Sequence, residues 1–166
     1  MYDVNYNLPK RSGERPKTRG PMPHIQLDQL ASPAIETKLA SSIFSIDGLT
    51  QKPTRMSLPG ARGIFLKSKS DAKLSLVLSS DGEIGHIHPA PELGSMHLQI
   101  AEDLANELID NEWGEFHPLV HQGAFPPTLV MIYSPRNDEE ISMLNWFVKA
   151  SQAFVKGSTI QPYANI

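Results

Sequence analysis

The chain has 166 residues, of which 40% are hydrophobic and 20% charged, and its net charge is −3. This composition is typical of a globular protein with one hydrophobic core. It shows neither a long apolar run nor a signal pattern, so we expect no membrane partner and a cytoplasmic location. The lack of cysteine excludes disulfides and thiolate chemistry.

The first 23 residues differ from the rest of the chain in charge and in proline content. They hold five Lys or Arg against two Asp or Glu, so this arm carries +3 and residues 24–166 carry −6. Four prolines disfavour a helix in the arm. We predict an extended basic arm over 1–23 and a single domain over 24–166. Apolar side chains should dock the arm on the body or on a second copy, giving a possible homodimer; they are Tyr2, Val4, Tyr6, Leu8 and Met22. No nucleic-acid reader motif accompanies the basic residues, so we expect no nucleic-acid partner.

The first half of the body is predicted to contain a helix and then extended segments. Ser32-Pro33 is a typical helix start, and the apolar spacing after it predicts a helix over 33–44. Residues 54–67 should be extended, with an interruption at Pro59-Gly60. Alternating residues in 73–79 and 83–88, joined by Asp81-Gly82, predict a β-hairpin. Its register would put His86 and His88 on one face, opposite the Leu74, Leu76 and Leu78 face.

The second half is predicted to alternate helices with strands. Ser95 could cap a helix that runs to about residue 110, which would place His97 in a first turn, where the helix dipole opposes protonation. Residues 113–118 should be extended and 128–133 should form a buried strand. Asn137 with Glu140 predicts the start of a long helix that ends at Gly157. This order favours an α+β fold, with an antiparallel sheet packed against helices.

Three histidines and a glutamate lie within the stretch G-H-I-H-P-A-P-E-L-G-S-M-H, residues 85–97. The spacing His86-x-His88-x₃-Glu92 resembles the first cupin motif, but the helix expected from Ser95 interrupts the cupin pattern. A divalent metal could still bind to His86, His88, Glu92 and His97. Metal-free acid/base chemistry is the competing interpretation. In the third interpretation the residues have only structural roles: His97 is a core residue and Glu92 caps a helix.

Several motifs resemble the small luciferase-domain proteins of fungi and bacteria, over about residues 15–156. They are H-I-H-P-A-P-E-L-G-S-M-H, W-G-E-F-H-P-L, M-I-Y-S-P-R-N-D-E-E and R-P-K-T-R-G-P-M-P-H-I-Q-L-D-Q. The order of elements is also similar to YjbR-like proteins, which implies a frataxin-like fold. The resemblance implies a small biosynthetic enzyme of secondary metabolism. The chain lacks an adenylation loop and is too short for a flavin-type barrel, so we do not expect light emission.

We therefore predict a cofactor-independent enzyme for cyclisation, isomerisation or dehydration of a small, largely apolar metabolite. The proposed acid and base are His88 and His97, oriented by Glu92 and Glu115. The proposed substrate-binding residues are His86, His117, Arg55 and Trp113. A metal-dependent enzyme with the same cluster is one alternative, and a noncatalytic module that binds a small ligand or a partner is another.

Overall fold

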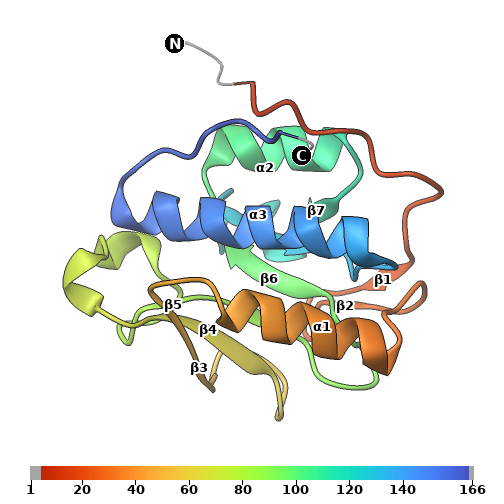
Figure 1. Cartoon of the computed structure of the whole chain (residues 1–166), viewed down its shortest axis with the longest axis horizontal. Coiled ribbons are helices and arrows are strands. Elements are labelled where there is room, and N and C mark those ends of the chain that lie inside the picture. The colour runs from red at the N-terminus through yellow and green to blue at the C-terminus, as the bar shows by residue number, and fades with distance from the viewer. Residues whose placement is uncertain (1–4, 165–166) are drawn as a thin grey trace.

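The computed structural model describes residues 5–164, and it contains one antiparallel sheet of six strands (Figure 1). The order across the sheet is β3, β4, β5, β6, β8, β7. The strands are β3 (Leu49–Pro53), β4 (Arg62–Leu66), β5 (Glu83–Ile87), β6 (Met96–Gln99), β7 (Gly114–Phe116) and β8 (Leu129–Ile132). A separate two-stranded sheet pairs β1 (Thr18–Arg19) with β2 (Ile25–Gln26). The α+β prediction with an antiparallel sheet is confirmed.

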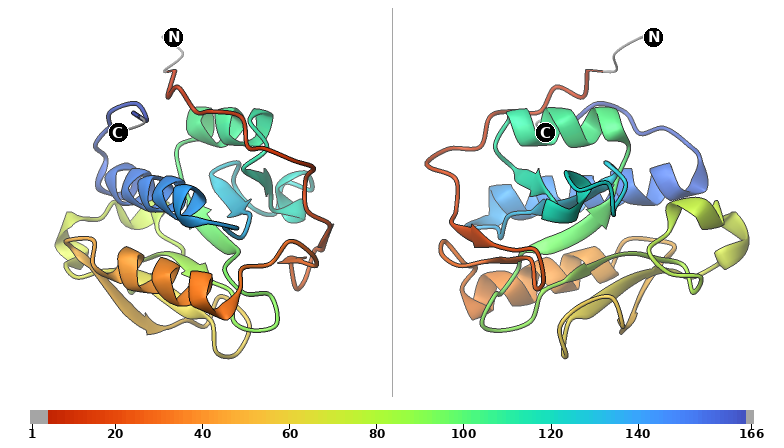
Figure 2. Two further views of the ribbon diagram at one scale, coloured as in Figure 1. Left: turned by 45° about the vertical axis from the view of Figure 1, so that its right-hand side comes forward. Right: turned by 180° about the vertical axis from the view of Figure 1, so that it is seen from behind.

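Three α-helices pack against one face of this sheet. They are α1 (Pro33–Phe44), α2 (Glu102–Asp110) and α3 (Asp138–Lys156), with short 3₁₀ turns at Lys69–Asp71, Leu74–Leu76 and Pro118–Val120. The core combines helix residues such as Leu39 and Phe147 with strand residues such as Ile64, Leu98 and Val130. Helices α1 and α3 run side by side, and the segment before β1 passes along α2 (Figures 1 and 2). The opposite sheet face is left for the end of the arm, the residues around β2 and the loops.

The helix ends predicted from local signals are confirmed for α1 and α3. The hydroxyl of Ser32 accepts the N–H of Ile35 (3.2 Å), and Pro33 is the first helical residue. The side chain of Asn137 accepts the N–H of Glu140 (2.9 Å). Gly157 ends α3 at a φ of 73°, a left-handed conformation that glycine adopts without strain.

The predicted hairpin of 73–79 with 83–88 is wrong. Residues 74–76 form a 3₁₀ turn and Leu74 is 65% exposed, so this segment is not a strand with an apolar face. Only one bridge, Ser79 to Glu83, follows from the Asp81-Gly82 turn. Strand β5 instead pairs with β4 and β6, because these partners bury its whole length from both sides.

The helix predicted from Ser95 begins six residues too early. Met96–Gln99 form strand β6 between β5 and β8, and the helix itself starts at Glu102. The apolar positions 101, 104 and 108 do follow a helical spacing, and the prediction extended that spacing back to residue 97. His97 is therefore a strand residue, and the helix-dipole argument for its protonation does not apply.

Candidate functional site

A row of polar side chains crosses the sheet on the face opposite the helices. The strand register pairs His86 of β5 with His97 of β6, His97 with Met131 of β8, and Met131 with Glu115 of β7. Side chains of paired residues point to the same face of a sheet. Because Met96 and Leu98 flank His97 and point into the core, the alternation of β6 directs the imidazole away from the core.

Three more histidine side chains join this row from its edges. His88 follows β5, and its N–H donates to the backbone carbonyl of Ser95 (2.8 Å) just before β6. His24 directly follows the arm and precedes β2, and His117 precedes the 3₁₀ turn Pro118–Val120. All five histidines of the cluster are buried; they are His24, His86, His88, His97 and His117. The structure thus brings together residues that lie up to 93 positions apart in the sequence.

Five side chains form a continuous hydrogen-bonded chain along the cluster. Nε2 of His24 contacts Oε1 of Glu115 (2.7 Å), and Nδ1 of His24 contacts Nε2 of His97 (3.0 Å). Nδ1 of His97 then contacts Nε2 of His88 (2.9 Å), and Nδ1 of His88 contacts Oγ of Ser95 (2.9 Å). An ionised Glu115 can only accept a hydrogen bond, so Nε2 of His24 is the donor to it. In a chain of neutral imidazoles, Nε2 is then also the donor of His97 and of His88. The hydroxyl of Ser95 donates to Nδ1 of His88. Both ring nitrogens of each of these histidines are therefore engaged.

His86 is oriented separately, by Glu83. Its Nδ1 lies 3.0 Å from Oε1 of Glu83, which also accepts the hydroxyl of Thr54 (2.7 Å). Residues three apart on a regular strand point to opposite faces. The register between β4 and β5 shifts beside Ile84, since Ile64 pairs with Gly85 and Phe65 with Glu83. This irregularity brings Glu83 to the same side as His86.

Burial keeps most of the cluster uncharged. Desolvation, together with the nearby His86 and His24, lowers the pKa of His88 to about 3. Desolvation and the four surrounding histidines also lower the pKa of His97 well below its ordinary value. Desolvation and His24 lower the pKa of His117 to about 4.

Glu115 is the charged end of the chain. Burial raises the pKa of this carboxyl, but hydrogen bonds from His24, Thr18 and Tyr133 outweigh that effect, and the net change is a lowered pKa. The hydroxyl of Tyr133 donates to Oε2 of Glu115 at 2.9 Å. The Glu115 side chain retains 26% exposure, so it is the member of the chain in contact with solvent.

The five imidazoles line a pocket of about 540 Å³ whose walls are otherwise mainly apolar. The walls come from the end of the arm (Pro21, Met22, Pro23), from Ile25 of β2, from the loop before β4 (Arg55, Met56, Ser57, Leu58, Pro59) and from Leu78, Phe125 and Leu129. A concave, mostly apolar pocket with a few converging polar groups is typical of a site for a small organic ligand. We take this imidazole pocket as the candidate site.

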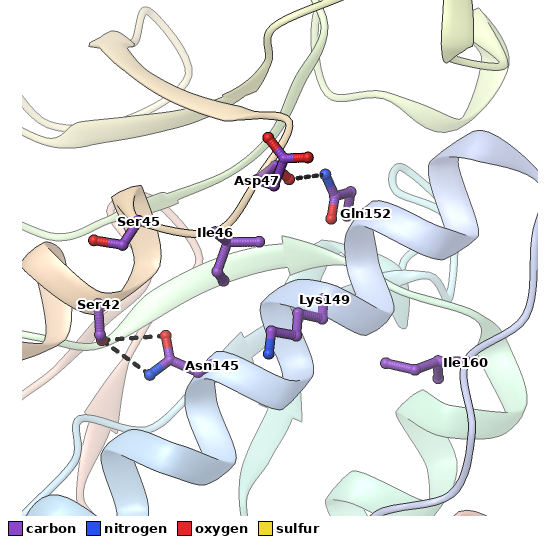
Figure 3. A pocket seen from close by; sticks show the side chains of 8 residues that line it. All are labelled: Ser42, Ser45, Ile46, Asp47, Asn145, Lys149, Gln152 and Ile160. Carbon is purple, nitrogen blue, oxygen red and sulfur yellow. Dashed lines mark hydrogen bonds between the residues drawn. The ribbon is translucent and has the colours of Figure 1, made fainter.

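A second hollow lies on the helix side of the molecule, between α1, α3 and the segment after α3 (Figure 3). Its polar groups largely pair with each other or with the backbone. Ser42 hydrogen-bonds to Asn145 (2.9 Å), and Nε2 of Gln152 donates to the carbonyl of Asp47 (2.8 Å). Lys149 points from α3 with its side chain exposed. The hollow lacks converging titratable groups, so it does not compete with the imidazole pocket.

The predicted site residues divide into those that the structure assembles and those that it does not. Four of the predicted residues line the pocket as histidines: His86, His88, His97 and His117. Arg55 is exposed at the pocket wall. Glu115 contacts the cluster through His24. The backbone carbonyl of Glu92 lies 3.4 Å from Oγ of Ser95, and no hydrogen bond joins the Glu92 carboxylate to a described histidine. Glu83, rather than Glu92, is the carboxylate that contacts and orients His86.

Trp113 lies outside the pocket walls. It is 6% exposed in the hydrophobic core, where its ring packs against Phe147 and its Nε1 donates to the carbonyl of Pro9 (2.7 Å). Contact with the arm and the core accounts for its burial. The pocket that the described residues form does not include it, so its role in substrate binding stays a prediction.

Two residues of the site were not predicted, His24 and Glu83. His24 belongs to a proline-rich segment 62 positions before the other histidines of the cluster, and its only signal is that it is one of six histidines. Glu83 directly follows the Asp81-Gly82 turn, where an acidic residue is ordinarily solvated. The strand irregularity at Ile84 that turns it towards His86 has no local sequence signature.

The same imidazoles could hold a metal ion. Two sets of three histidines have potential ligand atoms within 4.8 Å of one another: His86, His88 and His97, and His24, His97 and His117. Neutral imidazoles suit zinc, iron or copper. Glu92 is in neither set, so the metal ligands predicted from the sequence are brought together only in part.

Comparison with known proteins shows a similarity that covers part of the chain. Residues 81–151 match the family model described as the luciferase domain. Over these residues the chain is similar to luciferase-domain proteins. It is 30% identical to a luciferase of Armillaria gallica over 164 residues, which cover 90% of this chain and 61% of that protein. A luciferase of Neonothopanus nambi is 35% identical over 75 residues, 44% of this chain and 28% of that protein.

The chain spans about three fifths of the length of the Armillaria relatives that it matches. The matched residues 81–151 contain four of the five clustered histidines together with Glu83 and Glu115. No solved structure gives a significant match, so the YjbR-like order of elements stays a prediction. In the part of the chain that the structure describes, no helix combines the length and apolarity that crossing a membrane requires.

Proposed function

We propose that the protein is an enzyme that transfers protons on a small, largely apolar metabolite without a cofactor, as in cyclisation, isomerisation or dehydration. The observation that carries this proposal is the set of five buried imidazoles that line one side of an apolar pocket of about 540 Å³. Neutral imidazoles both accept and donate protons near neutral pH, which makes histidine the commonest general acid or base.

The pocket supports the proposal through its size and its walls. A volume of about 540 Å³ lies within the range of sites for small organic ligands. The proline, methionine and leucine side chains of the walls favour an apolar ligand body, and they exclude water from the reacting atoms. The relatives' name, luciferase, denotes enzymes and so favours catalysis over passive binding. We do not extend light emission to this shorter chain.

Metabolite profiling tests the proposal. The purified protein is incubated with a metabolite extract of the organism that carries the gene, and the compounds are compared by mass spectrometry. We expect one compound to be consumed and to give a product of equal mass or of mass lower by one water. The H97Q variant should abolish the conversion, because His97 is the centre of the cluster. The matched control is H121Q, since His121 is exposed and outside the cluster; conversion should persist. Binding without conversion would favour a noncatalytic module.

A metal-dependent enzyme is the second candidate function, and a specific observation favours it. The carboxylate of Glu83 contacts Nδ1 of His86, and the carboxylate of Glu115 contacts Nε2 of His24. Metal-bound histidines ordinarily have such partners. Metal analysis of protein treated with a chelator separates the two candidates. Under our proposal conversion survives the chelator; loss of stoichiometric metal with loss of conversion, both restored by the ion, would replace it by the metal mechanism.

A further inference from the structure

Two ring nitrogens of the cluster have no hydrogen-bond partner in residues 5–164, Nε2 of His86 and Nε2 of His117. The other nitrogen of each ring is engaged: Nδ1 of His86 with Glu83 (3.0 Å), and Nδ1 of His117 with the N–H of Leu119 (3.2 Å). Among the described residues, the enclosed side-chain atoms without a partner lie elsewhere, on Arg11 and Gln99. Since both histidine rings line the pocket, their Nε2 atoms are open to it. A ligand can reach them without breaking an existing hydrogen bond.

These two nitrogens have opposite hydrogen-bonding character. Oε1 of Glu83 accepts the Thr54 hydroxyl, whose own oxygen accepts the N–H of Met56 (2.9 Å). Oε1 is therefore an acceptor, Nδ1 of His86 carries the proton, and Nε2 of His86 holds a lone pair. A backbone N–H can only donate, so Nδ1 of His117 holds a lone pair and Nε2 carries the proton.

We propose that His86 is the general base of the site and His117 its hydrogen-bond donor, with Glu83 as the residue that positions His86. This inference rests on the proposed function and names the groups and the substrate class. The two rings flank His97, with ring centroids 5.3 Å (His86) and 5.4 Å (His117) from that of His97. The fitting substrate has an ionisable O–H or C–H next to an oxygen acceptor, as in an enolisable carbonyl compound.

The proton step balances within these groups. Nε2 of His86 takes a proton from the substrate O–H or C–H, and the electron pair of that bond stays on the substrate as an enolate-type anion. The imidazolium of His86 is stabilised by the carboxylate of Glu83, and Nε2–H of His117 donates to the anionic oxygen. His86 then returns the proton to another substrate atom, which completes an isomerisation or a cyclisation. No oxidant or reductant is required.

His88 and His97, the acid and base predicted from the sequence, have a different place in this scheme. Both of their ring nitrogens are engaged within the chain that ends at Glu115. Proton transfer to either ring would require breaking one of these bonds. We assign them to the floor of the pocket, where they fix the surroundings of His86 and His117.

Nuclear magnetic resonance of protein labelled with ¹⁵N histidine tests the assignment without a substrate. We expect the Nδ1–H form for His86 and the Nε2–H form for His117 at neutral pH. In E83Q, the amide can donate to Nδ1, so His86 should change to the Nε2–H form. The matched control is E92Q, which should leave His86 unchanged. An Nε2–H form of His86 in the wild-type protein, or no change in E83Q, would overturn the assignment.

Carbethoxylation by diethyl pyrocarbonate gives an independent readout, because the reagent attacks the lone pair of a neutral imidazole. Peptide mapping should show His86 modified about tenfold faster than His88 and His97, whose lone pairs are engaged. E83Q should lower the rate at His86 by about tenfold. Exposed His121 serves as the internal standard. Equal rates at His86 and His88 would contradict the proposal, as would protection of His86 by a stoichiometric metal.

If E83Q fails to fold, T54V offers a milder change, since it removes only the hydroxyl that donates to Glu83. It should leave the Nδ1–H form of His86 in place but broaden its signal as Glu83 gains freedom; an unchanged signal would count against positioning through Glu83. Neither measurement needs turnover. Correct tautomers without conversion of any metabolite would therefore refute the proposed function alone, and conversion with the wrong tautomers would refute this inference alone.

Discussion

Individual histidines of this cluster are kept neutral at a cost in stability that depends on pH. An imidazole moved from water into a protein interior loses solvation mainly in its charged form, which lowers its pKa. The pKa falls to about 3 for His88 and to about 4 for His117. The unfolded chain titrates its histidines near 6.5, so it binds more protons than the folded chain below that value.

Acidification should therefore destabilise the fold. For His117 the loss begins as the pH falls through about 6.5 and is complete near 4. Each histidine with a lowered pKa contributes up to about 1.4 kcal/mol per pH unit to the slope. Urea unfolding between about pH 7 and about pH 5 measures this slope. H117N removes one titrating group but can keep an acceptor for the N–H of Leu119, so the slope should become flatter. H121N should leave the slope unchanged; equal slopes in all three proteins would contradict the neutral cluster.

How far single site residues could be predicted depends on whether their partners are local. The alternate spacing of His86 and His88 on a strand indicates a shared site, and His97 is found because it lies close to both in the sequence. Their tautomers follow from Glu83, Ser95 and Glu115, which the register of distant strands and a local irregularity bring into contact. The sequence therefore locates the cluster but not the ring nitrogens that face the ligand.

At the scale of elements, the site depends on close pairing between β5 and β6. Gly85 of β5 pairs with Leu98 of β6 and has no side chain where the strands meet. A Cβ at this position would overlap the backbone carbonyl of His97 and the Cδ2 atom of Leu98. Glycine in a strand often marks such a close approach.

The G85A substitution should destabilise the protein and displace His97. Overpacking in a buried region costs about 1–3 kcal/mol, because neither a backbone carbonyl nor a core leucine can move freely. The urea midpoint gives the loss of stability. G123A is the matched control, because nothing lies within 4 Å of a Cβ at Gly123. Its only cost should be the left-handed backbone at a φ of 73°, which is about 1 kcal/mol for a residue with a Cβ. An equal or smaller loss for G85A would show that β5 and β6 separate easily.

The elements that local signals predicted well are those whose ends are set by local contacts. Helices α1 and α3 begin at side-chain caps, and such caps can be read from neighbouring residues. Strand β6 has four residues between two buried strands, and its pattern also fits the start of a helix. Its pairing with β5 and β8 decides in favour of a strand, and tertiary pairing of this kind overrides local propensity.

At the scale of the whole molecule, the arm supplies both packing and part of the pocket wall. Tyr6 and Leu8 are buried in the main core. Met22 is 76% exposed, so it is not buried against the body as we expected. Tyr2 and Val4 lie outside the described residues. Arg11 is buried, and its Nη2 donates to the carbonyl of Ser134 (3.0 Å) and to Oε2 of Glu140 (3.2 Å). The predicted homodimer through the arm stays a prediction.

A chain that begins at Gly13 should therefore lose stability while it keeps His24. Burial of the Tyr6 and Leu8 side chains contributes about 1.5–3 kcal/mol each, and each kcal/mol shifts the Tm by about 2–4 °C in a chain of this length. We expect the Tm to fall by at least about 6 °C, nearly as much at high salt as at low salt, because surface charge is screened but burial is not. The control replaces the exposed Lys10, Lys17 and Arg19 by glutamine, which should change the Tm little. Light scattering on the same samples reports whether the mass also changes. An unchanged Tm in the shortened chain, or an equal fall in the charge variant, would show that the arm binds through charge rather than through apolar contacts.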